Sequence, residues 1–435
     1  MPKITFIGAG SVVFTKNVLS DCFSYPELQE STVTLFDIDP DRLAVAGQMV
    51  TKLAEFWGAH PTIETTPDPE EAFAGADYAI NAIQVGRYDP CTITDFEIPK
   101  KYGLRQTIGD TLGIGGIMRA LRTIPVMVEY CALMEDVCPD VTLLNYTNPM
   151  SMITWAILES SEINAIGLCH SVQGSYRHLA EALGLNADEV NWTCAGINHM
   201  AFYLTLEHNG VDLYPAILEK VASGEYAPDW DRVRLDMLQR LGYYITESSE
   251  HFSEYNPWYL KRDRPELVEK FNIPLDEYPR RCIRDQKWYE ENAADLAAGK
   301  GYEDLKRSTE YASRIIHAME TGERELIHGS VLNDDLIDNL PYGCCVEVPV
   351  MVDKNGLQPV KVGLLPPQCA ALNRTAINVQ ELTVYAALTE TRENVYHAAM
   401  MDPHTAAELT LDEIWSMVDD LLAAHRDWLP SYLTD

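Results

Sequence analysis

The first 40 residues constrain the fold more than any other part of the chain. Residues 3–7 form a short apolar run that ends in Gly8-Ala9-Gly10-Ser11, and a helical pattern follows. A second strand-like run, 32–36, ends at Asp37-Ile38-Asp39. A strand, a glycine turn, a helix and an acid at the end of the next strand are typical of a dinucleotide-binding unit.

This pattern predicts a cofactor site for NAD. The glycines let the backbone approach a pyrophosphate at the helix N-terminus. The acid can accept hydrogen bonds from ribose hydroxyls and disfavours a 2'-phosphate. Val13 stands at the third glycine position, so a purely structural tight turn is the alternative. The predicted cofactor-binding residues are Gly8, Gly10, Ser11, Asp37, Asp39 and Gln84.

Strand-like and helical patterns alternate over the first two hundred residues. The further apolar runs 77–83, 141–146 and 165–168 are each followed by polar residues. This alternation predicts a right-handed, mostly parallel α/β sheet with its ligand crevice at the carboxyl ends of the strands. The loop 84–88 is expected to line that crevice, and within it Arg87 is expected to contact the substrate.

The pattern changes after residue 201. Residues 202–206, followed by Asn209-Gly210, indicate an antiparallel strand and turn, and 231–241 and 302–320 are predicted to be helices. Residues 346–352 and 360–362 flank Lys354-Asn355-Gly356 and predict a hairpin. No linker separates the two halves. The expected architecture is therefore an N-terminal Rossmann-like domain (1–195) and a closely packed, mixed α+β C-terminal domain (196–435), as in lactate and malate dehydrogenases.

Charge and cysteine usage exclude several classes of partner. The formal charge is -33, from 33 Lys plus Arg and 66 Asp plus Glu, which argues against nucleic acid and membrane surfaces. No apolar run approaches the roughly 18 residues of a membrane span, and the chain starts without a signal-peptide apolar region. The ten cysteines lack regular spacing, which favours free thiols and a cytoplasmic location.

Two short segments place metal-ligand side chains after strand-like runs. Cys169 lies in Gly167-Leu168-Cys169-His170, and His199 lies in Gly196-Ile197-Asn198-His199-Met200. A thiolate and an imidazole together suit several divalent transition metals. On spacing alone, a buried thiol and a hydrogen-bonded imidazole without metal is the stronger interpretation.

Several polar residues outside these segments are further candidates. Asn148 can hydrogen-bond a hydroxyl or a ribose, although it can equally be a turn residue. Asp110 can make a nearby phenol more basic, although a solvated loop acid is the simpler interpretation. Residues 247–259 are dense in acid/base groups and aromatics, including Tyr255, and we expect this stretch to enter the site. Arg281, next to Arg280, can hold substrate oxygens or lie on a helix surface.

Longer strings resemble glycoside hydrolase family four, whose members are NAD- and manganese-dependent glycosidases. They are Phe6 to Ser11, Asp110 to Gly116, Asn145 to Pro149, Gly167 to His170, Gly196 to Met200 and Val346 to Pro349. Other strings are similar to members that hydrolyse unphosphorylated α-galactosides such as melibiose. These strings are Tyr88 to Thr92, Met118 to Pro125, Cys169 to Gly174 and Thr246 to Pro257.

The resemblance implies a glycosidase that does not use the usual carboxylate pair. NAD⁺ takes a hydride from sugar carbon 3, and a base removes the acidified proton at carbon 2. Elimination at carbon 1, addition of water and return of the hydride complete hydrolysis with retained configuration. An α-galacturonidase or α-glucosidase of the same family is the alternative, and an NAD-dependent sugar or hydroxyacid dehydrogenase is a more distant one.

The resemblance also implies roles for individual residues. Cys169 and His199 bind Mn²⁺ or another divalent metal. Asn148, with Arg87 and Arg281, contacts the substrate. Asp110 makes the base more basic, and the base is Tyr255 or His251. His170 stands where the phospho-sugar branch has an acidic residue, so it is either the leaving-group acid or a substrate-binding residue. The family also implies a homodimer or homotetramer.

Overall fold

The N-terminal alternation builds the parallel part of a nine-stranded sheet in the computed structural model, which describes residues 1–434. The strand order is β12-β11-β10-β6-β5-β4-β1-β2-β3. Its six N-terminal strands run parallel in the dinucleotide-fold order 3-2-1-4-5-6. They are β1 (Lys3–Ile7), β2 (Thr32–Phe36), β3 (Thr62–Thr66), β4 (Tyr78–Asn81), β5 (Thr142–Asn145) and β6 (Asn164–Gly167).

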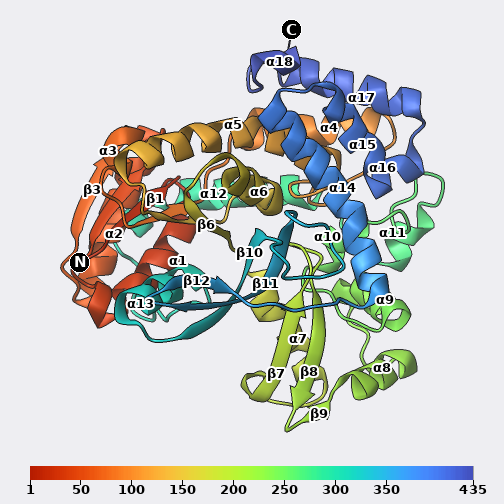
Figure 1. The fold of residues 1–435 in the computed structure, drawn as a ribbon, viewed down its shortest axis with the longest axis horizontal. Helices are drawn as coiled ribbons and strands as arrows, with labels where there is room; N and C mark the ends of the chain where they lie inside the picture. The colour runs from red at the N-terminus through yellow and green to blue at the C-terminus, as the bar shows by residue number, and fades with distance from the viewer. Residues whose placement is uncertain (435) are drawn as a thin grey trace.

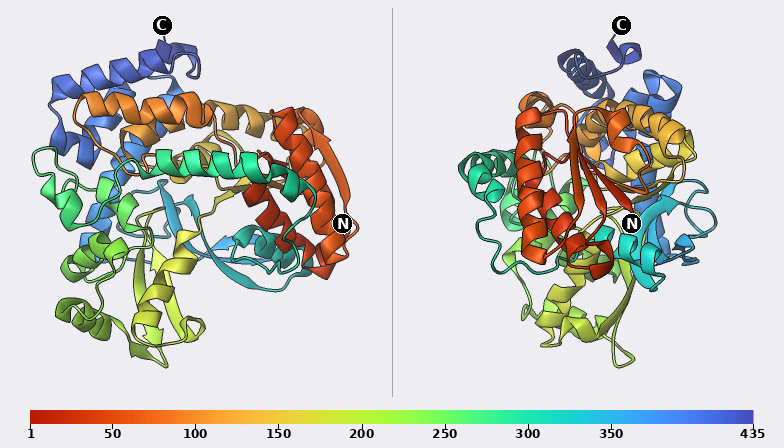
Figure 2. Two further views of the ribbon diagram at one scale, coloured as in Figure 1. Left: turned by 180° about the vertical axis from the view of Figure 1, so that it is seen from behind. Right: turned by 90° about the vertical axis from the view of Figure 1, so that its left-hand side faces the viewer.

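Helices cover both faces of this sheet (Figure 1, Figure 2). On one side lie α1 (Val12–Phe23), α2 (Pro40–Trp57), α12 (Glu277–Ala297) and α13 (Tyr311–Thr321). On the other lie α5 (Gly113–Val137), α6 (Met150–Ser160) and α14 (Pro367–Thr389). Short helices α3 (Pro69–Phe73) and α4 (Ile93–Lys101) connect strands to this layer. The main hydrophobic core fills the space between the sheet and these helices.

Three antiparallel strands from the C-terminal half extend the same sheet. They are β10 (Glu325–Leu332), β11 (Cys345–Asp353) and β12 (Gly356–Pro359). Ser330 of β10 pairs with Gly167 of β6, so the sheet continues across the predicted domain boundary at residue 195. The predicted architecture, a parallel N-terminal sheet with a tightly packed C-terminal part, is confirmed, and the boundary itself stays a prediction.

A smaller lobe and a helical cap complete the molecule. The lobe, at the bottom of Figure 1, has a second antiparallel sheet with its own core. Its elements are α7 (Ser171–Ala182), β7 (Val190–Ala195), β8 (Phe202–His208), β9 (Val211–Asp212), α8 (Tyr214–Ser223) and α9 (Arg232–Leu241). The short α10 (Ser249–Glu254) and α11 (Glu266–Lys270) follow, and α15 (Glu393–Met401), α16 (Pro403–Glu408), α17 (Leu411–Ala424) and α18 (Ser431–Thr434) form the cap.

Two local predictions were wrong. The helix expected from residue 302 begins only at Tyr311. Ser308 is held by Asp21 through its backbone N–H at 2.8 Å, and Arg307 lies over the Tyr25 ring at 3.6 Å, so this segment is fixed against the end of α1. The hairpin partner is β12 rather than 360–362, because the two-residue turn places Gly356 directly opposite Asp353.

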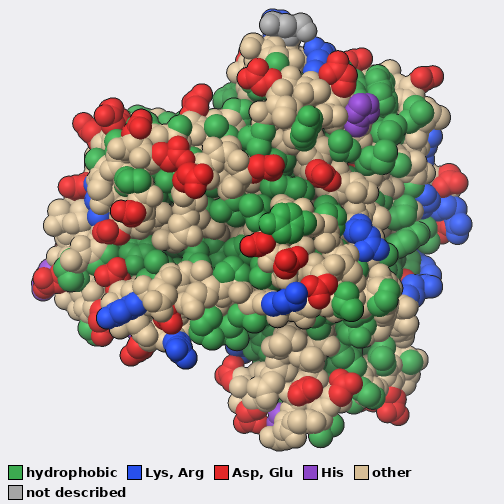
Figure 3. Space-filling model, viewed as in Figure 1, with side chains coloured by type: hydrophobic (Ala, Val, Ile, Leu, Met, Phe, Trp, Pro, Cys, Tyr) green, Lys and Arg blue, Asp and Glu red, His purple; other side chains and the backbone are tan. Residues whose placement is uncertain are grey.

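The surface carries the acidic excess of the composition. Figure 3 shows Asp and Glu side chains scattered over the whole viewed face, with Lys and Arg much sparser. Within residues 1–434, no helix combines the length and the apolar character that crossing a bilayer requires.

Candidate active site

The glycine turn lies where the carboxyl ends of β1, β2 and β4 meet. Gly8 has φ +85°, and a side chain there would lie 3.0 Å from the Ala82 backbone. Gly10 donates its backbone N–H to Asp37 Oδ2 at 2.7 Å. Ser11 follows, exposed, at the N-terminus of α1. The turn therefore needs glycine, and it presents a helix N-terminus of the kind that binds phosphates.

The two predicted acids have structural partners in this region. Asp37 accepts the backbone N–H groups of Gly10 and Asp39, one on each carboxylate oxygen. Asp39 caps α2, and the backbone N–H of Arg42 helps to hold the pKa of its carboxyl below the usual value. The Asp39 carboxylate also lies 3.2 Å from Arg87 Nη2. The structure thus brings Arg87 to the cofactor residues rather than to Asn148.

Gln84 lies at the rim of the same crevice. Its Nε2 donates to Thr92 Oγ1 at 3.3 Å. Behind it, the buried Arg122 donates to the Val85 carbonyl at 3.2 Å and pairs with Asp95 at 2.6 Å. The loop after β4 is therefore anchored from within the core.

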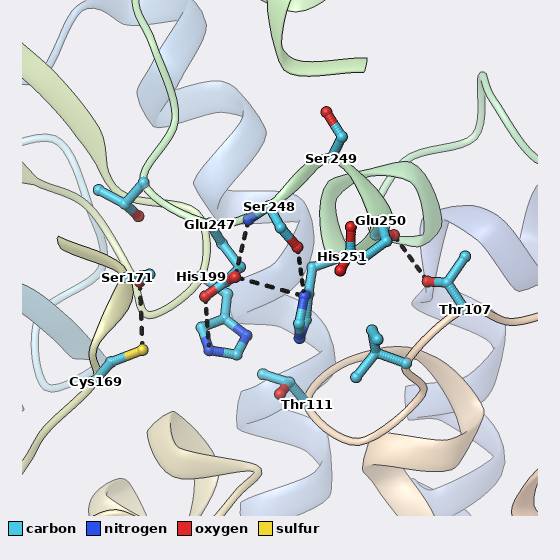
Figure 4. A network of polar contacts seen from close by, with 12 residues as sticks. Thr107, Thr111, Cys169, Ser171, His199, Glu247, Ser248, Ser249, Glu250 and His251 are labelled. Carbon is cyan, nitrogen blue, oxygen red and sulfur yellow. Dashed lines mark hydrogen bonds and ion pairs between the residues drawn. The ribbon is translucent and has the colours of Figure 1, made fainter. Parts of the chain in front are cut away.

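The two predicted metal ligands lie together, with a third group that the sequence did not single out. Ligand atoms of Cys169, His199 and Glu247 all lie within 4.8 Å of one another, as Figure 4 illustrates. Glu247 Oε2 is 3.4 Å from His199 Nε2. Because no two of these atoms are more than 4.8 Å apart, a point exists at most about 2.8 Å from all three, and small side-chain movements would reach metal–ligand distances of roughly 2.0–2.3 Å.

The backbone and charge of this trio favour a cation. His199 has φ +62°, an uncommon conformation for a residue with a side chain and one that clusters at functional sites. Burial raises the pKa of the Cys169 thiol to about 11, and the nearby acids Glu247 and Glu347 act in the same direction. Glu347 is fully buried, and neither of its carboxylate oxygens has a hydrogen-bond partner. A sulfur, nitrogen and oxygen donor set with this excess of buried acid fits a divalent transition metal.

The histidines adjust the ionisation of the Glu247 carboxylate. Burial alone would raise its pKa, but His199 and His251 outweigh that effect and lower the pKa to about 2. His251 Nδ1 lies 3.5 Å from Glu247 Oε1 and 2.9 Å from Ser248 Oγ (Figure 4). Burial lowers the pKa of His251, so this ring is neutral at pH 7 and can accept a proton.

Tyr255, the other candidate base, also reaches the metal ligands. Its phenol oxygen lies 3.0 Å from His199 Nδ1, and its ring is buried. Burial first, and then the charges of Glu254 and Asp110, raise the pKa of the phenol well above its usual value. A neighbouring cation acts in the opposite direction, because it favours the phenolate.

Asp110 and Asn148, two of the predicted site residues, contact each other, while their roles stay predictions. Asn148 Nδ2 donates to Asp110 Oδ2 at 3.0 Å, and Thr111 Oγ1 donates to Asp110 Oδ1 at 2.8 Å. Sequence reasoning missed Arg119, which is buried one helical turn into α5. Arg119 donates to the Asn148 carbonyl at 3.0 Å and lies 4.0 Å from Asp110.

His170 and Arg281 lie farther out. The His170 side chain is 61% exposed, pairs with Glu310 at 2.8 Å and packs against the neighbouring Phe14 and Tyr146 rings. Partial burial lowers its pKa, but Glu310 outweighs this and raises the pKa to about 9. Arg281 pairs with Glu250 of α10 and Glu277 of α12, and its predicted contact with the substrate stays a prediction.

Comparisons with known proteins agree with this geometry. Residues 3–185 match the sequence profile of the family 4 glycosyl hydrolases, and residues 194–405 match the profile of their C-terminal domain. An α-galactosidase of Bacillus subtilis (strain 168) is 50% identical over 432 residues, which cover 99% of this chain and 100% of that protein.

Solved structures share the fold. The 6-phospho-β-glucosidase of Thermotoga maritima, solved with manganese, NAD⁺ and glucose-6-phosphate, superposes with a TM-score of 0.79 at 21% identity over 98% of this chain and 99% of that one. The malate dehydrogenase of Plasmodium falciparum, solved with NADH, has a TM-score of 0.52 at 14% identity over 89% of this chain and 99% of that one. The predicted dehydrogenase-like fold is therefore confirmed.

Proposed function

The chain belongs to the family 4 glycosyl hydrolases, and we propose that it is an α-galactosidase for unphosphorylated α-galactosides such as melibiose. The relative that shares half of its residues over the full length is an α-galactosidase. The observation that supports the chemistry is the meeting of Cys169, His199 and Glu247 with the Tyr255 phenol. A sulfur–nitrogen–oxygen trio beside a candidate base suits proton abstraction next to a cation.

Two bound groups would complete this site. The glycine turn and the N-terminus of α1 would hold NAD, which when bound supplies a hydride acceptor for a sugar alcohol. Cys169, His199 and Glu247 would hold the metal, Mn²⁺ by preference, which when bound stabilises negative charge on sugar oxygens. The unpartnered carboxylate of Glu347 supports this assignment, because a buried acid beside three ligand groups favours a cation nearby.

The chain's own residues then have distinct tasks. Asn148, held by Asp110, binds a sugar hydroxyl and so orients the ring. Tyr255, in the phenolate form that a bound metal cation would favour, would take the proton from sugar carbon 2, and His251 is the second candidate for that task. His170 is protonated at neutral pH, because Glu310 raises its pKa to about 9, and it donates a proton to the departing glycosidic oxygen. The exposed position of His170 suits contact with a leaving group that must reach solvent.

The direct test is hydrolysis of a chromogenic α-galactoside. Activity should vanish after dialysis against a chelator and return only when both NAD⁺ and Mn²⁺ are added. Full activity of the chelator-treated protein without either addition would refute the proposal. Matched α-glucoside and α-galacturonide substrates should react more slowly than the α-galactoside. If the α-galacturonide reacts faster, the enzyme is an α-galacturonidase.

Whether NADH accumulates distinguishes a hydrolase from a dehydrogenase. A glycosidase of this kind returns the hydride to its own intermediate, so the NADH absorbance at 340 nm should stay constant at steady state. Sustained growth of that absorbance would indicate net oxidation of the sugar. Incorporation of deuterium at sugar carbon 2 during turnover in heavy water would report the proton abstraction directly.

Assembly and location complete the proposal. We place the enzyme in the cytoplasm, in keeping with ten cysteines that are all free thiols. We also propose a homodimer or homotetramer, which light scattering of the purified protein would measure.

A further inference from the structure

Glu254 is a buried carboxylate that binds a loop of the site instead of a cation. It ends α10 and directly precedes Tyr255 in the chain. Its side chain is 4% exposed, and none of the ion pairs within residues 1–434 includes it. An ionised carboxylate is costly to bury unless other groups compensate its charge.

Three successive backbone amides hold the Glu254 carboxyl and offset part of this cost, although burial still raises its pKa to about 7. The Glu254 Oε2 atom accepts the N–H of Thr107 at 2.7 Å, and Oε1 accepts those of Ile108 and Gly109 at 3.3 and 2.8 Å. Successive N–H groups in a turn form an anion-binding concavity, and hydrogen bonds to a charged acceptor are about twice as strong as neutral ones. A second contact adds to this, because Thr107 Oγ1 donates to the Glu250 carbonyl at 2.8 Å.

The bound loop leads directly to the substrate-binding pair. Gly109 has φ +57°, and the next residue is Asp110, whose carboxylate holds the Asn148 amide at 3.0 Å. On the other side of Glu254, Tyr255 reaches His199 at 3.0 Å. One carboxylate thus connects the segment that carries the candidate base with the segment that orients the sugar.

We propose that Glu254 is a positioning residue that sets the candidate base against the substrate-binding loop 107–110. The proposal rests on the proposed function, because the base and the sugar-binding pair are assigned there. It assigns Glu254 no contact with the sugar, NAD or the metal. Small displacements of reacting groups, on the order of 1 Å, cost about a hundredfold in rate, so the expected effect is on turnover.

The Glu254→Gln variant tests this with almost no change in shape. Whichever way the amide is turned, its NH₂ group faces either the Thr107 N–H or the N–H groups of Ile108 and Gly109. One half of the cradle therefore loses its acceptor, and the loop is released. Glu408→Gln is the matched control. Glu408 is also a buried glutamate that accepts a backbone N–H, from Arg262 at 2.6 Å, but it pairs with Lys261 at 2.7 Å as well and lies in α16, outside the residues assigned to the site.

The expected result for Glu254→Gln is a 10- to 100-fold lower kcat with KM and Mn²⁺ affinity within twofold of wild type. The kinetic isotope effect with substrate deuterated at carbon 2 should increase, because proton abstraction then limits turnover more strongly. Amide hydrogen exchange of residues 107–109 should accelerate. Glu408→Gln should keep kcat within twofold and leave that exchange unchanged, even where its melting temperature falls.

Two results would overturn the proposal. One is wild-type kcat and wild-type exchange of residues 107–109 in Glu254→Gln. The other is a loss of kcat that does not depend on the loop contact. Such a loss would appear equally in Glu408→Gln, or would come with an equal loss of Mn²⁺ affinity, and both patterns indicate general destabilisation. An inactive wild-type enzyme in the presence of NAD⁺ and Mn²⁺ would instead refute the proposed function, and the exchange measurement would still report whether Glu254 holds the loop.

Discussion

Replacing Glu247 with glutamine should weaken metal binding without disturbing the fold. Glu247 Oε2 lies 3.4 Å from His199 Nε2, and the neighbouring histidines lower the pKa of the carboxyl to about 2. The group is therefore ionised at any pH used for assay. Glutamine keeps an oxygen in the same place and the same volume, so the variant removes only the negative charge.

The size of the effect follows from the makeup of the trio. Of the three ligand groups, Cys169 and Glu247 can carry negative charge, and the variant leaves only the thiolate. Loss of a group that only hydrogen-bonds a metal ligand already weakens affinity by about 10- to 100-fold, so removing the charge of a ligand should cost at least as much. This range corresponds to about 1.4 to 2.7 kcal/mol.

The assay is titration of chelator-stripped protein with Mn²⁺, with free Mn²⁺ followed by electron paramagnetic resonance. Glu250→Gln is the control, because it makes the same charge change three residues away on a side chain that pairs with Arg281. The control should bind Mn²⁺ within twofold of wild type. Equal affinities of Glu247→Gln and wild type would show that Glu247 is not a ligand, and equal losses in both variants would show a general charge effect.

Three further predictions concern the base and the core. Tyr255→Phe should abolish deuterium incorporation at sugar carbon 2 while Mn²⁺ binding stays within twofold, and unchanged incorporation would transfer the role of base to His251. Arg122→Met should lower the free energy of unfolding, measured in urea, by about 3–5 kcal/mol, because it leaves the buried Asp95 without its main partner. It should also weaken NAD binding, because Arg122 anchors the loop after β4 through the Val85 carbonyl. A loss of stability below about 1 kcal/mol would contradict this prediction. His328→Phe should make the protein less sensitive to acid. Burial lowers the pKa of His328 to about 3 from 6.5, so only the unfolded chain binds the proton at pH 5. The free energy of unfolding of the wild type should therefore fall by about 2 kcal/mol between pH 8 and pH 5, whereas that of the variant should not show this loss.

The sequence predicted the parallel half of the fold because that half depends on local signals. The apolar run 3–7, the glycine turn and the acid at Asp37 occur within 40 residues, and their spacing alone defines the unit. The pairing of β10 with β6 joins residues more than 160 positions apart, and no local pattern specifies such a contact. The extent of the sheet was therefore beyond sequence reasoning, and two of its strands, β3 and β10, were not predicted at all.

The candidate site also contains residues that the sequence singled out and one that it did not. Cys169 follows β6 and His199 follows β7, which lie in different sheets, so their spacing alone favoured no metal and the family resemblance supplied the prediction that they meet. Glu247 is one of several acids in a polar stretch, and nothing in that stretch distinguishes it from Glu250 or Glu254. Their different surroundings come from the turn of α10, which directs Glu247 to the histidines and Glu254 to the amides of residues 107–109.

The antiparallel extension of the sheet also supports the metal site. Gly196 exchanges two backbone hydrogen bonds with Glu347 of β11, at 3.0 and 2.8 Å. This bridge fixes the start of the segment that carries His199 in its left-handed conformation, and it places the buried Glu347 carboxylate beside the ligands. A segment with an unfavourable backbone conformation persists only when its surroundings hold it in place. The strands that distinguish this sheet from a plain dinucleotide-binding domain are therefore the ones that support the proposed metal site.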